Sequence, residues 1–165
     1  MRPSSILMAG LLSGLLCACG GVRSVVPDHT TLPEVRAKVG NPTDIRFDSN
    51  GDELWEYGGG IRGTETYLVR AGQDGLVKSV MQLRSEEQFY KIQAGQSTKA
   101  DARHLLGQPS DESFLYNGTS WSWRAQITGQ RVELVVHFGP NDVVLSKLIV
   151  PDSKGDDSKR GESGK

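Results

Sequence analysis

The sequence predicts an α+β fold of two tandem units, each a short helix or helix pair packed on a roughly four-stranded antiparallel sheet. The first observation is a repeat: TLPEVRAKVGNPTD at Thr31–Asp44 recurs as TKADARHLLGQPSD at Thr98–Asp111, 67 positions later. The second is that each copy precedes short alternating segments separated by Gly, Asn and Asp turns. Matches that keep one spacing and the same structural roles indicate a duplicated unit.

Each copy predicts one short helix with a start and a stop. Thr31 and Thr98 can cap the N-terminus, and an acid three residues on (Glu34 or Asp101) can complete a capping box. A glycine then supplies the left-handed residue at the helix end, and a proline keeps the helix from resuming. The shared frame is Thr31/Thr98, Arg36/Arg103, Gly40/Gly107, Pro42/Pro109 and Asp44/Asp111.

The segments after each helix predict antiparallel strands. In the first unit, residues 31–84, we expect strands at 44–47, 53–57, 64–70 and 75–83, with a turn at 48–52 and a flexible glycine connection at 58–63. The second unit, residues 85–150, adds a short helix at 85–92 before its repeated helix. Its expected strands are 112–116, 120–126, 131–138 and 143–150, with turns at Asn117-Gly118 and Gly129-Gln130.

Four aromatic residues lie in corresponding strands of the two units: Trp55, Tyr57, Trp121 and Trp123. Residues two apart on a strand share one face, where they either pack beneath the helix or form a surface for a partner. The repeat favours the core, because a shared fold needs the same packing residues in both copies.

The first residues predict a lipoprotein signal peptide over 1–18. A positive n-region is followed by an apolar run at 6–16, which is too short for a transmembrane helix. The run ends in Leu16-Cys17-Ala18-Cys19, which is similar to a bacterial lipobox. We expect lipidation at Cys19, because a thiolate can take a diacylglycerol group and Cys17 has a bulky leucine beside the cut. Residues 19–30 then read as a lipidated tether, and residues 151–165 as a disordered polar tail.

Composition and motifs exclude several functions. The net charge of -1 gives no field that favours nucleic acid, and both cysteines lie at the front of the chain. We therefore expect no metal site and no cofactor, and the calcium-loop mimic at 48–59 lacks the required Gly and Glu. His104 and His137 are scattered and read as structural residues, with no nucleophile beside them. The expectation is a protein that is not an enzyme and has no small-molecule substrate.

The stretch Gly95-Gln96-Ser97-Thr98, followed by Leu105-Leu106-Gly107-Gln108-Pro109 and tryptophan-rich strands, resembles the SmpA/OmlA/BamE lipoproteins. The tandem arrangement also resembles the β-lactamase inhibitor protein fold. The lipoprotein resemblance implies an accessory scaffold of outer-membrane β-barrel assembly that supports envelope integrity. Acylated Cys19 would hold it in outer-membrane lipid at the periplasmic face, and subunits of the barrel-assembly machinery would be its partners. The alternative is a lipoprotein module that binds or inhibits a periplasmic enzyme.

Overall fold

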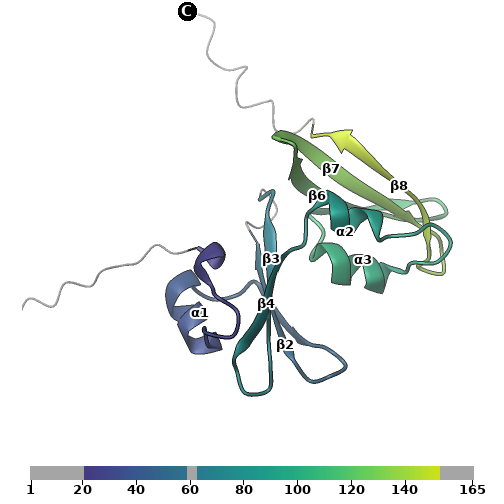
Figure 1. The fold of residues 1–165 in the computed structure, drawn as a ribbon. Coiled ribbons are helices and arrows are strands. Elements are labelled where there is room, and N and C mark those ends of the chain that lie inside the picture. The colour runs from purple at the N-terminus through teal and green to yellow at the C-terminus, as the bar shows by residue number, and fades with distance from the viewer. Residues whose placement is uncertain (1–20, 59–62, 153–165) are drawn as a thin grey trace, which may run out of the picture.

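The computed structural model describes residues 21–58 and 63–152. The predicted signal peptide, Cys19, the middle of the glycine connection and almost all of the predicted tail lie outside the described residues. Two units follow one another along the chain, and each has helices on one face of its own four-stranded antiparallel sheet (Figure 1). The predicted α+β fold of two tandem units is confirmed.

The first unit begins with the short 3-10 helix η1 (Val22–Ser24), followed by helix α1 (Leu32–Val39). Its sheet has the order β1-β2-β3-β4. The strand bounds are β1 Asp44–Phe47, β2 Glu53–Gly58, β3 Thr66–Ala71 and β4 Val77–Gln82. Alternate residues of β2 and β3 face α1, so Trp55, Tyr57 and Val69 form a buried core with Val35 of α1.

The second unit has two helices, α2 (Glu86–Tyr90) and α3 (Lys99–Leu106), against a sheet of order β5-β6-β7-β8. The strand bounds are β5 Asp111–Leu115, β6 Gly118–Ile127, β7 Gln130–Phe138 and β8 Val144–Pro151. Trp123 and Leu134 pair across β6 and β7, and both are fully buried under Ala102 and Leu106 of α3. The expectation that Trp55, Tyr57 and Trp123 are core residues is confirmed, whereas Trp121 is only partly buried.

The duplication extends nine residues further towards the N-terminus than the sequence pattern predicted, to Val22. Asp28 N–H donates to the carbonyl of Val77 at 2.8 Å, and 67 residues later Gly95 N–H donates to the carbonyl of Val144 at 2.8 Å. Isolated bridges join Thr31 to Leu76 and Thr98 to Val143 in the same way. In the core, Val22 and Val25 of the first unit occupy the positions of Phe89 and Ile92 in the second.

Part of the segment predicted as a lipidated tether, residues 19–30, packs into the first unit from Val22 onward. Val22 and Val25 are buried in the first core, and this apolar contact holds the segment against the sheet. The sequence signal was weak because two valines in a Gly- and Pro-containing stretch show no period, and only the spacing to Phe89 and Ile92 reveals their role.

Several boundaries also differ from the prediction by one or two residues, among them two turns and the start of the tail. The β5–β6 turn is Tyr116-Asn117 rather than Asn117-Gly118, and the β6–β7 turn is Thr128-Gly129 rather than Gly129-Gln130. Both Thr128 and Gly129 have positive φ, as a two-residue type I′ turn requires. Pro151 ends β8 instead of beginning the tail.

Both predicted capping boxes form. A carboxylate oxygen of Glu34 accepts the backbone N–H of Thr31 at 2.8 Å, and Asp101 accepts that of Thr98 at 2.8 Å. Both helices end at a glycine of positive φ, Gly40 and Gly107. Within the described residues, no helix is long and apolar enough to cross a membrane.

Candidate functional sites

Cys19, the one residue that the sequence assigned to a specific chemical role, lies outside the described residues. The two histidines of the units have ordinary surroundings: His104 is exposed on α3, and the Nδ1 atom of His137 lies 3.2 Å from the hydroxyl of Ser146. Among the described residues, no group of three or more His, Cys, Asp and Glu side chains is arranged to hold a metal ion.

The most exposed apolar feature is the edge strand β5 and the turn that follows it. All five residues of β5 are exposed, and Phe114, Leu115 and Tyr116 keep 84%, 43% and 108% of their surface open to solvent. Natural proteins usually shorten, charge or cover an edge strand, because unpaired N–H and C=O groups there recruit another strand. β5 carries two charged residues at its start, Asp111 and Glu112, whereas its last two residues, Phe114 and Leu115, are apolar and exposed. An exposed edge strand is one of the places where proteins pair with an extended segment of a partner.

The backbone of β5 is oriented for such pairing. Leu115 and Gly118 flank a two-residue turn and pair with each other, and the pairing then alternates along the hairpin through Ser113–Ser120. Glu112 and Phe114, which alternate with these positions, turn their backbone groups to the open edge, where the N–H of Glu112 already donates to the carboxylate of Asp111 at 3.1 Å. On the other side of β6, Gly118 allows β7 to lie close, because a Cβ at this position would overlap the carbonyl oxygen of Phe138.

The corresponding edge of the first unit is less available. Phe47 of β1 lies 67 residues before Phe114 and is also exposed, at 66%. However, the side chains of Asp44 and Arg46, which alternate with Phe47 along β1, point to the opposite face of the strand and are held in ion pairs. The spacing of 67 residues between the two phenylalanines is the signal in the sequence that marks them as corresponding edge positions, and the sequence-based prediction did not use it.

Where the two units meet, the buried carboxylate of Glu56 organises a network of ion pairs. Glu56 is only 2% exposed, and its Oε2 atom accepts from Arg46 at 3.0 Å and from Arg103 of α3 at 2.7 Å. Its Oε1 atom accepts the backbone N–H of Gln108 at 2.9 Å. Arg103 also donates to Asp44 at 2.7 Å, so two residues of the duplicated frame meet across the junction.

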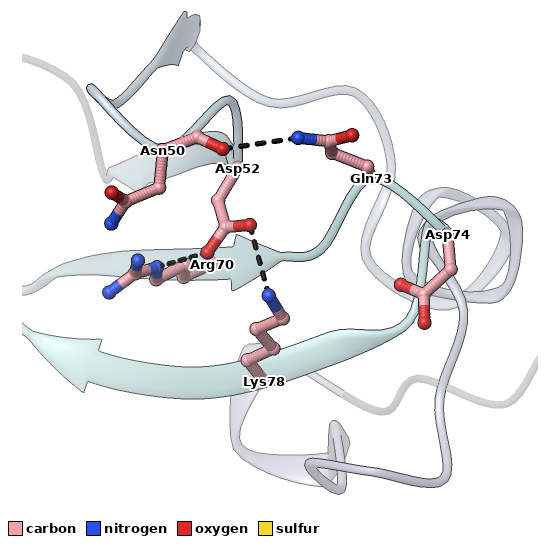
Figure 2. A pocket seen from close by; sticks show the side chains of 6 residues that line it. All are labelled: Asn50, Asp52, Arg70, Gln73, Asp74 and Lys78. Atoms are coloured by element: carbon pink, nitrogen blue, oxygen red, sulfur yellow. Dashed lines mark hydrogen bonds and ion pairs between the residues drawn. The ribbon is translucent and has the colours of Figure 1, made fainter.

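A polar cleft of about 470 Å³ lies at the end of the first sheet that carries the β1–β2 and β3–β4 turns (Figure 2). Asp52, which is 4% exposed, accepts from Lys78 at 3.0 Å and from Arg70 at 2.8 Å. Asp74 accepts the backbone N–H of Leu76, and Gln73 donates to the carbonyl of Asn50. Because Asp52, Arg70 and Lys78 are paired with one another, we interpret this part of the cleft as a structural ion cluster.

The carboxylates of the cleft and the helix caps predict a loss of stability in acid. The hydrogen bond from Lys78 lowers the pKa of Asp52, and the backbone N–H groups of Thr31 and Thr98 lower those of Glu34 and Asp101. A folded-state pKa below the unfolded value stabilises the fold at higher pH, and this contribution disappears as pH falls through the folded value. We expect the free energy of unfolding, measured in urea, to be level above about pH 5 and to fall below about pH 4.

An Asp52→Asn variant tests this origin. It removes one of the three lowered carboxyl groups, so its free energy of unfolding should depend less steeply on pH between about 4 and 2 than that of the wild type. Parallel pH profiles for the two proteins would show that Asp52 makes no such contribution.

No family model matches this chain, and no curated protein matches it. One solved structure that is similar to it is a DUF4309 family protein (YjgB) from Bacillus subtilis. The two chains are 15% identical, the match covers 78% of this chain and 83% of the other, and the TM-score is 0.29. A similarity of this size supports no statement about the fold or function of this chain.

Proposed function

We propose that this protein is a lipid-anchored accessory scaffold of outer-membrane β-barrel assembly, located at the periplasmic face, which binds an extended segment of an assembly subunit along β5. It acts by binding and positioning, without catalysis or a cofactor. The observation that carries this proposal is the exposed edge strand β5, with Phe114 and Leu115 as its last two residues and Tyr116 directly after it. The resemblance of the Gly95–Pro109 stretch to the SmpA/OmlA/BamE lipoproteins supplies the partner class.

The anchor is consistent with a short link to the membrane. Val22 is buried in the first unit only three residues after Cys19. Three residues span at most about 11 Å. An acylated Cys19 would therefore hold the first unit close to the lipid headgroups.

The test is a cross-linking pull-down from outer membranes, comparing the wild type with Cys19→Ala. We expect barrel-assembly subunits with the wild type and their loss with Cys19→Ala, together with release of the variant from the membrane fraction. Several buried acyl chains at about 0.8 kcal/mol per methylene hold a protein permanently, so removing them should give complete release.

The identity of the captured protein separates the two candidate functions. A soluble periplasmic enzyme in place of assembly subunits would overturn the scaffold proposal and favour the inhibitor or binding module. If Cys19→Ala still sediments with membranes, the assignment of the anchor is wrong.

A further inference from the structure

A small cavity lies at the junction of the two units, and two buried polar groups of its wall have no hydrogen-bond partner in the fold. Its volume is about 130 Å³, and its walls include Glu56, Thr66, Arg84 and Gln108. Thr66 is fully buried and Arg84 is 3% exposed. Neither the hydroxyl of Thr66 nor the Nε atom of Arg84 has a hydrogen-bond partner.

Arg84 is held rigidly in this position by its other nitrogens. Its Nη1 atom donates to the carbonyl of Gly63, and its Nη2 atom donates to the carbonyl of Gln108 at 3.1 Å. Three sequence segments therefore meet at one guanidinium. A buried unpaired donor costs about 1–3 kcal/mol, more when it is charged, so such groups normally meet a ligand or ordered water.

The wall of the cavity carries two carboxylates, Asp44 and Glu56, and one guanidinium, Arg84. Both carboxylates are ion-paired with Arg46 and Arg103, which do not line the cavity and which bring the charged groups of the junction to three guanidinium groups and two carboxylates. Three positive charges and two negative charges give a net charge of +1. Both oxygens of Glu56 already accept hydrogen bonds, from Arg46, Arg103 and Gln108. The carboxylate of Glu56 therefore does not accept a hydrogen bond from the Nε atom of Arg84.

The burial of the charged Arg84 side chain costs desolvation free energy, and the direction of its pKa shift reflects this cost. Desolvation lowers the pKa of Arg84, while the charge of Glu56 acts in the opposite direction. Bringing one negative charge into the cavity would offset this desolvation and would satisfy the two unpartnered groups together.

We propose that this cavity binds one small monovalent anion, a halide or a carboxylate of formate size, held by the Nε–H of Arg84 and the hydroxyl of Thr66. A volume of about 130 Å³ has room for such an ion with one or two waters, since a water occupies about 30 Å³ in the liquid. Because its walls come from both units, the bound anion would strengthen the junction. This inference does not depend on the scaffold proposal.

The test uses chloride and bromide as probes on the folded protein with both units. In solution, the ³⁵Cl NMR line should broaden with the wild-type protein, and this excess broadening should be lost with Arg84→Gln and with Thr66→Val. The matched control is Arg23→Gln, which removes an equal charge from an exposed arginine paired with Glu65 and should broaden the line as the wild type does. In crystals soaked in bromide, an anomalous peak should lie in the cavity.

Competition with formate shows which anions the site accepts. Formate that displaces chloride at constant ionic strength assigns the site to carboxylates as well, and failure to displace it assigns the site to halides; either outcome supports an anion site. Equal line widths for wild type and Thr66→Val, with only water in the cavity of the bromide-soaked crystal, would overturn the proposal. Thr66→Val keeps both the charge network and the side-chain volume close to native, so this arm remains decisive if Arg84→Gln does not fold.

Discussion

Replacing Glu56 with alanine is expected to lower the free energy of unfolding by about 3 kcal/mol, because breaking a buried ion pair from one side leaves charges without partners. Glu56 accepts from Arg46, Arg103 and the backbone of Gln108, all at 3.0 Å or less. The loss should lie near the lower end of the usual range, since Asp44 continues to accept from both arginines.

Urea unfolding measures this loss, and Glu87→Ala is the matched control. Glu87 pairs with Lys91 on an exposed helix face, with 79% of its side chain open to solvent. Its removal should change stability by no more than about 0.5 kcal/mol. A double-mutant cycle of Glu56→Ala with Arg103→Ala should show strong coupling, and simple additivity of the two losses would contradict a junction organised by this pair.

The second large effect is expected at Trp123. This residue is fully buried, and its indole N–H donates to the carbonyl of Gly107 at 2.9 Å, where helix α3 ends. Trp123→Ala removes a large core side chain and leaves that carbonyl without its donor. We expect a loss of about 3–5 kcal/mol.

Trp121 provides the comparison within the same strand. It packs edge-on to Trp123 at 6.0 Å and to Phe138 at 5.2 Å, but it is only partly buried and its Nε1 atom has no partner. Trp121→Ala should therefore cost clearly less than Trp123→Ala when both are measured by urea unfolding. A larger loss at position 121 would contradict the assignment of Trp123 to the centre of the second core.

Much of the fold could be predicted because local signals and the repeat agreed. Thr31 and Thr98 indicate where the helices start, and Gly40 and Gly107 indicate where they end. These signals depend only on a few neighbouring residues. Of the two turns that shifted by a residue, the β5–β6 turn did so for a tertiary reason. Gly118 is needed as the first residue of β6 because Phe138 approaches it too closely for a side chain.

What could not be predicted depends on contacts between distant segments. Arg36 and Arg103 occupy the same place in the repeat, yet Arg36 lies over the ring of Trp55 at 4.7 Å while Arg103 reaches the other unit. Similarly, Arg84 gives no signal in a sequence because its partners are backbone carbonyls of Gly63 and Gln108. The packing of Val22 and Val25 belongs to the same class, since only the full tertiary arrangement shows where they lie.

The central proposal, partner binding along β5, is tested most directly by photo-cross-linking in cells. A photoreactive residue placed at Phe114 is compared with one at Phe47, the corresponding and similarly exposed position of β1. The proposal predicts an adduct between position 114 and a barrel-assembly subunit, with little or none from position 47. No adduct from 114, or equal adducts from both positions, would contradict a docking surface on the second edge.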